Sequence, residues 1–297
     1  MHVIKHHMDA FACSGAPTDY TGMSHCTNTF DVSECGPWVA VYDKGAGDYR
    51  LPDDVGLAIG EGTGFTWILL QTHYLMTEEP KDLSTLSSIG NSGFKLWLQV
   101  GGTQRTNNAR FLGIIDMTMD VPKDAAEHAY SVPAQTLQSF IQHDLDRFGN
   151  VTVFAGRLHA HDHCDGLYVD VRRQDPDTPT PSPWDAVAAL APYGVCNNNQ
   201  TVQDFGPTSA VGPGVALRGG EELRVRCTWR APHPRLPYGT DLGQEMCGAM
   251  LLYHPTDAAA AQDKMAYEGP GYGGAAAARG TATTPQLLRT ARHTEKY

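Results

Sequence analysis

Short segments rich in β-branched and aromatic residues, separated by Gly, Pro, Asn and Asp, recur along most of this 297-residue chain. In the segment GLYVDVRR, Leu167, Val169 and Val171 alternate with polar positions, as in a strand with one buried face. Many short strands between turn signals favour antiparallel β-sandwiches over a wound α/β sheet. The segments that we expect to be strands are 64–76, 93–100, 110–121, 150–161, 166–173, 222–229 and 245–254.

Helical signals are few. Alanine-rich runs predict short helices at 187–192 and 256–267, the second with Thr256 as its N-cap. Residues 134–145, AQTLQSFIQHDL, fit either a helix or a strand, so that segment stays open. The Pro-rich run at 174–184 is typical of a surface loop.

Charge and apolar content limit the partners of the chain. Acidic residues number 33 and basic residues 22, without a basic face for phosphates, so we expect no nucleic-acid partner. The most apolar run, FTWILLQTHYLM, contains Gln71 and His73, and we expect no membrane span. Because 41% of the residues are hydrophobic, the chain can bury a sizeable core. These features predict an acidic globular protein.

Composition changes divide the chain into parts. The polar run GGTQRTNN at 101–108 is typical of a linker, and the Gly- and Ala-rich stretch from about Pro270 favours a disordered tail. We therefore expect an all-β fold with two tandem antiparallel sandwiches and a C-terminal tail. The expected boundaries are 1–105 for the first sandwich, 106–256 for the second, and 257–297 for a short helix and the tail.

The seven cysteines indicate an oxidising compartment. None forms a Cys-x-x-Cys pair, so a zinc knuckle or a redox motif has no support. Wide spacing in a β-rich chain suits disulfides, whose connectivity stays open at this point, and the odd count leaves one thiol over. Sequons at Asn150 and Asn199 agree with a secreted glycoprotein. We expect the protein to be secreted or to lie in a vesicle lumen.

The segment VTVFAGRLHAHDHCDG carries the strongest chemical signal. Because side chains alternate along a strand, His159, His161 and His163 are expected on one face, with Arg157 beside them. Imidazoles that converge from one rigid strand favour a metal site over a polar, solvent-facing strand. The strand alone leaves the metal open. A metallo-β-lactamase would carry Asp at position 163, and a cupin would carry a Glu soon after the second histidine.

Met246 narrows the choice of metal. It lies in the expected strand 245–254, on the same face as Gly248 and Met250. Its thioether is either a packing group of the core or a soft ligand. Two imidazoles and one thioether together favour Cu(I) over zinc, magnesium or calcium.

A second candidate cluster is the adjacent pair His6–His7 together with His73 in LLQTHYL. Successive residues of a regular strand point to opposite faces. Joint ligation by His6 and His7 therefore requires a local distortion of their strand.

The motifs together resemble one family, the copper type II, ascorbate-dependent monooxygenases, which includes peptidylglycine α-hydroxylating monooxygenase and dopamine β-monooxygenase. The matching segments follow the family's order from about His6 to His254; they are HHMDAFAC, GEGTGFTWILLQTHY, VFAGRLHAH and EMCGAMLLYHP. The resemblance implies two tandem, jelly-roll-like β-sandwiches, each holding one copper ion.

The resemblance also implies the ligands. The copper that supplies electrons would be held by three histidines: His6, His7 and His73. The copper that activates oxygen would be held by the catalytic set of two imidazoles and one thioether: His159, His161 and Met246. His163 then lies outside the ligand set, and Gln71 lies near the first copper, on the strand face of His73.

The implied activity is hydroxylation of a C–H bond in a small molecule or peptide by O2, with ascorbate as the reductant. The alternative is a non-catalytic copper-binding protein of the same fold, which one copper per chain rather than two would indicate. A histidine-ligated zinc hydrolase is a third option; Asp162 points to the opposite strand face from His161, although Asp165 remains.

The substrate pocket implied by the resemblance matches the family at one position and differs from it at two. Arg157 matches the arginine that meets a substrate carboxylate in the peptide-hydroxylating branch, a role that suits a bidentate guanidinium. Gly248 and Met250 stand where that branch has polar residues, which predicts a more apolar wall. The His6–His7 pair lies close to the start of the chain, so we expect the first sandwich to be N-terminally truncated.

Disulfides follow from the same resemblance. It pairs Cys227 with Cys247 and Cys13 with Cys35. Cys164 and Cys196 remain and are expected to pair with each other, which leaves Cys26 as the odd thiol. No cysteine follows Cys247 and none lies between Cys35 and Cys164, so both halves of a further bridge that the resemblance implies for the second domain are missing.

Overall fold

The computed structural model describes most of the expected strands and one helix. The described residues are 3–15, 35–43, 48–60, 63–76, 93–99, 105–132, 134–161, 163–174, 182–190, 202–204, 214–239, 244–256 and 264–268. Within them almost all regular structure is β, and the all-β fold class predicted from the short alternating segments is confirmed. No helix in these ranges has the length and apolar character that a membrane span requires.

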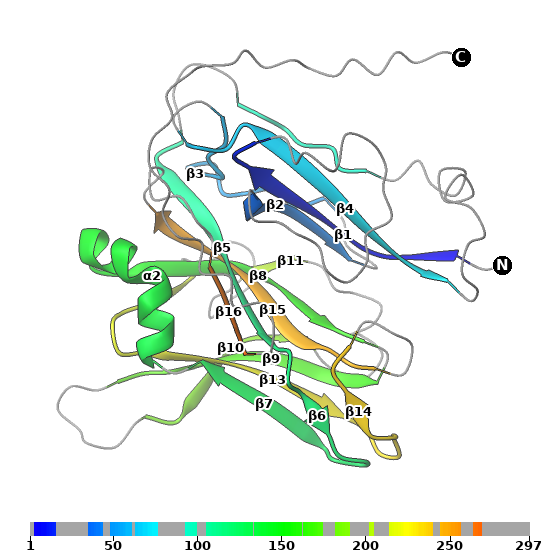
Figure 1. Ribbon diagram of the computed structural model, residues 1–297. Helices are drawn as coiled ribbons and strands as arrows, with labels where there is room; N and C mark the ends of the chain where they lie inside the picture. Colours follow the sequence, from blue (N-terminus) through cyan, green and yellow to red (C-terminus); the bar gives the residue numbers. More distant parts are fainter. Residues whose placement is uncertain are drawn as a thin grey trace, which may run out of the picture.

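Two sheets, one antiparallel and one mixed, face each other and form a sandwich (Figure 1). One has four strands, in the order β10 (Trp184–Leu190), β9 (Cys164–Arg172), β13 (Glu222–Trp229) and β7 (Glu127–Val132). The other has seven strands along the path β11 (Val202–Asp204), β8 (Val151–Ala160), β15 (Cys247–Thr256), β5 (Asn107–Asp116) and β16 (Lys264–Glu268). Its two remaining strands are β12 (Val215–Leu217), which pairs with β8, and β3 (Val55–Gly56), which pairs with β5.

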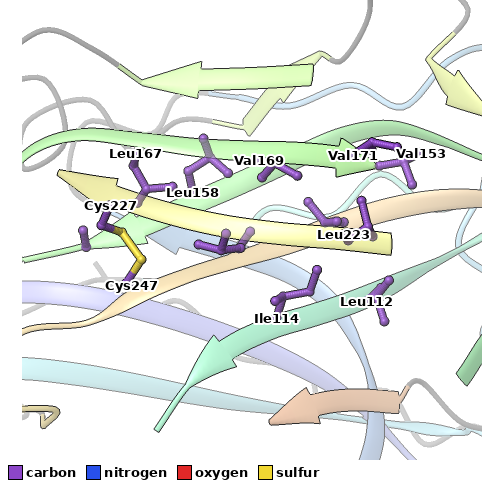
Figure 2. Packing of buried hydrophobic residues seen from close by; sticks show 14 of the residues in the cluster. Leu112, Ile114, Val153, Leu158, Leu167, Val169, Val171, Leu223, Cys227 and Cys247 are labelled. Carbon is purple, nitrogen blue, oxygen red and sulfur yellow. A yellow bond between two sulfur atoms is a disulfide. The ribbon is translucent and has the colours of Figure 1, made fainter. Parts of the chain in front are cut away.

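The main hydrophobic core lies between these two sheets (Figure 2). Leu167, Val169 and Val171 of β9 all point into it, as their alternation predicts. They meet side chains of β13 and of the facing sheet, among them Leu223, Leu158 and Ile114. The helix α2 (Ala134–Phe148) closes one end of the sandwich, where Ile141 and Leu145 join the same core.

A third sheet covers the outer face of the seven-stranded sheet. Its strands run in the order β2 (Cys35–Asp43), β1 (Val3–Cys13) and β4 (Trp67–Met76), all antiparallel (Figure 1). A second apolar cluster joins it to the sandwich, with the Trp38 ring packed edge-on against Phe111 of β5 at 6.3 Å between centroids. The outer face of the seven-stranded sheet is therefore buried as well as its inner face.

Irregular pairing on β8 decides which side chains reach that outer face. Ala155 pairs with Leu252 of β15, but Val153 pairs with Tyr253, so Phe154 is an extra residue on β8. A bulge of this kind reverses the alternation along the strand. Val153 therefore points into the sandwich core before the bulge, and Leu158 does so after it.

Several local expectations were wrong. Residues 187–190 lie in strand β10, not in a helix. Residues 264–268 form strand β16, parallel to β5, which overlaps the end of the helix expected at 256–267. Residues 93–99 form no strand, although their pattern alternates. Pairing with a neighbouring strand outweighs intrinsic helix propensity here, even that of alanine-rich runs. The open segment 134–145 is helical, within α2.

Candidate metal centres

His159 and His161 come together at the end of β8. His159 is on the outer face, since its strand neighbours Leu158 and Ala160 point into the sandwich core. The strand ends at Ala160, and His161 is the first residue beyond it. The two rings are both buried, with centroids 5.3 Å apart and planes almost perpendicular. Two imidazoles thus stand side by side in a region shielded from bulk water.

Met246 lies on the neighbouring strand segment. Cys247 pairs with Ala160 and Gly248 pairs with His159, so the antiparallel register places Met246 opposite His161. Cys247 and Ala249 point into the sandwich core, which puts Met246 on the other face, with the two histidines. Met246 is buried, with an exposed fraction of 7%. The structure therefore brings the three expected ligands to one face of two adjacent segments.

Hydrogen bonding orients the His161 ring. Its Nδ1 lies 3.0 Å from the Gln244 carbonyl oxygen, which can only accept a hydrogen bond. Nδ1 therefore carries the proton and donates to Gln244, which leaves Nε2 as the nitrogen with a lone pair. This is the usual arrangement around metal-binding histidines, where a hydrogen bond at one nitrogen fixes the tautomer.

His163 does not continue the row of histidines. β8 ends before it, and His163 lies in the turn that leads into β9, where its main-chain N–H donates to a carboxylate oxygen of Glu245 at 3.2 Å. The expectation that three histidines share one strand face was wrong, because the strand is shorter than the pattern. The exclusion of His163 from the ligand set, as the resemblance implies, agrees with this position.

Glu245 is the residue that sequence reasoning missed. Its side chain is 0% exposed and accepts hydrogen bonds from the main chain of His161, His163 and Met246 and from the Trp229 indole. Burial raises the pKa of this carboxyl, while the nearby His161 and the N–H donors oppose the shift. A carboxylate directly before Met246, at the start of an apolar strand, was the available signal.

Two disulfides lie where the resemblance implied. Cys227 and Cys247 are bonded and join β13 to the first residue of β15, next to Met246 (Figure 2). Cys13 and Cys35 are bonded between β1 and β2. Cys164 is also disulfide-bonded, whereas its expected partner Cys196 lies outside the described residues.

The other candidate cluster is described by its backbone alone. His7 of β1 pairs directly with His73 of β4, whereas Lys5 pairs with Tyr74, so His6 is an extra residue at that point. This register shift is the kind of local distortion that joint ligation by His6 and His7 requires. The side chains of these three histidines lie outside the described residues. Gln71, expected near them, pairs with Asp9 of β1.

Arg157 is deeply buried on the same face as His159. It pairs with Met250 of β15 and is 2% exposed. Burial lowers its pKa to about 10, while the charge of Asp9 on β1 opposes that shift. Burial likewise raises the pKa of Asp9 to about 6, and Arg157 opposes it. The two charges therefore face each other between the third sheet and the sandwich.

The side chains of His159, His161 and Met246 form a donor set that suits copper. Among the described residues, no group of three or more His, Cys, Asp or Glu side chains is placed to hold a metal. A site of two imidazoles and a thioether would not form such a group, because its third ligand is methionine. Two buried imidazoles that stand side by side, one with its tautomer fixed, and a buried methionine on the same face fit a soft cuprous ion.

Comparison with known proteins gives partial matches to one family. Residues 1–81 match the family described as copper type II ascorbate-dependent monooxygenase, N-terminal domain. DBH-like monooxygenase protein 2 of Mus musculus is 34% identical over 70 residues, which cover 23% of this chain and 11% of the mouse protein. Putative DBH-like monooxygenase protein 2 of Homo sapiens is 22% identical over 254 residues, which cover 84% of this chain and 47% of the human protein.

The chain spans less than half the length of both relatives. Among solved structures, that of infectious bursal disease virus Gx strain covers 86% of this chain and 56% of its own, at 10% identity. Its TM-score of 0.25 is too low to support an argument. The family match and the two relatives confirm the resemblance that the motifs predicted, to the copper type II, ascorbate-dependent monooxygenases.

Proposed function

We propose that this protein is a copper- and ascorbate-dependent monooxygenase that hydroxylates a C–H bond of a small molecule or peptide with O2. The observation that carries the proposal is the placement of His159, His161 and Met246 on one buried face of adjacent segments. The family match at residues 1–81 supports the same chemistry. Copper at this site, reduced by ascorbate, would supply the oxidation of the substrate by O2.

The chain's own residues would prepare the site for that chemistry. His161 presents Nε2 because its Nδ1 donates to the Gln244 carbonyl. The Met246 thioether, a soft and weak donor, favours the cuprous state and leaves coordination positions open. The apolar cluster around Phe111 and Phe154 shields the outer face of the sheet from water. A shielded site strengthens the electrostatic interactions within it.

His6, His7 and His73 would hold a second copper, and the chemistry supplied there would be the delivery of electrons. The direct pairing of His7 with His73 and the extra residue at His6 support this proposal. In the division proposed here, residues 1–105 carry the electron-supplying copper and residues 106–256 carry the oxygen-activating one. The pairing of β3 with β5 links these two parts of the chain, because β3 belongs to the first and β5 to the second.

Arg157 and Met250 are proposed to contact the substrate. They pair with each other across β8 and β15, on the face of the proposed ligands. A substrate carboxylate that reached Arg157 would compete with the charge of Asp9. Met250 and Gly248, two residues apart on one face of β15, would give the wall of the substrate pocket a largely apolar character. Such a wall suits a substrate with an apolar part near the reacting carbon.

The same proposal includes an oxidising compartment, either outside the cell or in a vesicle lumen. The disulfides Cys13–Cys35 and Cys227–Cys247 support it, because such bonds persist where thiols are not kept reduced. Glycosylation at Asn150 or Asn199 would be consistent with that location.

Oxygen uptake by copper-loaded protein with ascorbate and candidate substrates tests the proposed function. We expect uptake with hydroxylated product, two coppers per chain, and a large loss of activity in Met246→Leu, which keeps the volume but removes the sulfur. Met119→Leu is the matched control, since Met119 is buried in the sandwich core away from this face. One copper per chain without uptake would instead indicate a non-catalytic copper-binding protein.

A further inference from the structure

The buried carboxylate of Glu245 stands at the junction of three segments. Glu245 lies two residues before the start of β15, and its main-chain N–H donates to the Pro237 carbonyl at 2.9 Å. Its carbonyl in turn accepts from Gly239 at 3.3 Å. The backbone of Glu245 is thus anchored to residues 237–239 independently of its side chain.

The two carboxylate oxygens divide their contacts between the segments that carry the proposed ligands. Oε1 accepts the main-chain N–H of His161 in a close contact and that of Met246 at 3.0 Å. Oε2 accepts the His163 N–H at 3.2 Å and the Trp229 indole N–H at 3.3 Å. One oxygen atom therefore bridges the main chains of the residue that follows β8 and the residue that precedes β15.

The chemistry of the contacts requires a carboxylate at this position. All four partners are N–H donors, and an ionised carboxylate is the side chain that only accepts. A glutamine would turn an NH2 group toward at least one of these donors, and an apolar residue would leave all four without an acceptor. A buried charge is costly unless it is fully hydrogen-bonded, as it is here. The Cys227–Cys247 bridge ties β13 to β15 separately from this carboxylate.

We propose that Glu245 is a positioning residue that holds His161 and Met246 at a fixed separation through their main-chain N–H groups. The proposal rests on the proposed function, in which these two side chains ligate the same copper ion. The ladder between β8 and β15 ends at the pair Cys247–Ala160, so His161 and Met246 lie beyond its last pair of residues. Without the carboxylate the ends of the two segments would separate.

Glu245→Gln tests the proposal in two independent measurements. The first is Cu(I) affinity, from competition with a chelator, which we expect to fall roughly 10–100-fold, as when outer-shell partners of metal ligands are removed. The second needs no copper: amide hydrogen exchange in the metal-free protein should become faster at His161, His163 and Met246. Restoration of both quantities toward the native values in Glu245→Asp would support a carboxylate-specific role.

Glu221→Gln is the matched control. Glu221 is also buried and accepts hydrogen bonds from Arg173 at 2.9 Å and from the Arg218 N–H at 3.0 Å, at the opposite end of β13 from Trp229. We expect this variant to lose stability while Cu(I) affinity and exchange near His161 stay unchanged. If Glu245→Gln behaves like Glu221→Gln in both measurements, Glu245 is merely structural and the proposal is overturned.

Trp229→Phe keeps the test decisive if Glu245→Gln does not fold. This variant removes one hydrogen-bond donor to Glu245 and retains an aromatic ring. We therefore expect a smaller fall in Cu(I) affinity than in Glu245→Gln, and faster amide exchange at His163. If both the affinity and the exchange rate stay unchanged, the proposal is overturned. X-ray absorption of the native protein separates this test from the function itself. A Cu(I) complex without sulfur ligation would overturn the proposed function, while the exchange measurement would still decide whether Glu245 ties the segments together.

Discussion

At the scale of single residues, Gly248 shows how closely the strands approach beneath the candidate copper site. Gly248 pairs with His159 on one side and with Ile115 on the other. A Cβ atom at this position would lie 3.2 Å from both the Ile114 carbonyl oxygen and the Ile115 Cγ1 atom. These distances are tighter than ordinary packing, so a larger residue would force β15 away from β5.

Gly248→Ala is therefore expected to lower the free energy of unfolding by about 1–3 kcal/mol through overpacking. Urea unfolding measures this loss, and Cu(I) affinity reports any shift of Met246 that accompanies it. Gly93→Ala is the control, because a Cβ at Gly93 would meet nothing within 4 Å. Equal stability of the two variants would mean that β5 and β15 yield easily at this point.

Residue identity indicated which candidate ligands come together better than it indicated the residue that contacts their main chains. The histidine spacing and the soft sulfur of Met246 indicated a copper site, and the register of β8 and β15 agrees with it. Glu245 escaped notice because its role depends on segments far apart in the sequence that supply its N–H donors, including Trp229. A linear pattern holds no information on which donors meet which acceptor after folding.

At the scale of elements, period-two alternation predicted β9 and β13 well because each has one face in the sandwich core. It was less informative for β8, which is buried on both faces and contains a bulge at Phe154. Neither a bulge nor a strand end is encoded in a hydrophobic pattern. The alanine-rich segment of β10 was wrongly predicted as a helix, because its pairing with β9 is a tertiary interaction.

The bridge between β13 and β15 gives an element-scale prediction. Replacing both Cys227 and Cys247 by Ala opens a 20-residue connection and should cost about 3 kcal/mol of stability in the chain-entropy model. Because Cys247 is next to Met246, we also expect weaker Cu(I) binding at the His159–His161 site. The measurements are urea unfolding and chelator competition on the double variant.

The Cys13–Cys35 bridge is the matched comparison. Its sequence separation of 22 residues predicts a similar loss of stability, but it lies between β1 and β2. The corresponding double alanine variant should leave Cu(I) affinity at the His159–His161 site almost unchanged. A similar fall in affinity for both double variants would show that general loosening, and not the position of Met246, is responsible.

At the scale of the whole molecule, three sheets are stacked with the seven-stranded sheet in the middle (Figure 1). β1, with the pair His6–His7, belongs to the outer three-stranded sheet, and β8, with His159, belongs to the middle one. An apolar cluster that includes Phe11 and Trp38 joins the two sheets. The arrangement of the two candidate copper sites therefore depends on how these sheets dock.

The interaction between the charges of Asp9 and Arg157 gives a prediction about the stability of the contact between the three-stranded and seven-stranded sheets. Removing one partner of a buried charge pair typically costs about 3–5 kcal/mol, because the other charge stays buried without compensation. We therefore expect Asp9→Leu to destabilise the protein by about that amount. The double variant Asp9→Leu/Arg157→Leu should recover much of the loss, since it buries no charge. A double-mutant cycle on urea unfolding measures the coupling, and additive losses would show that the two side chains act independently.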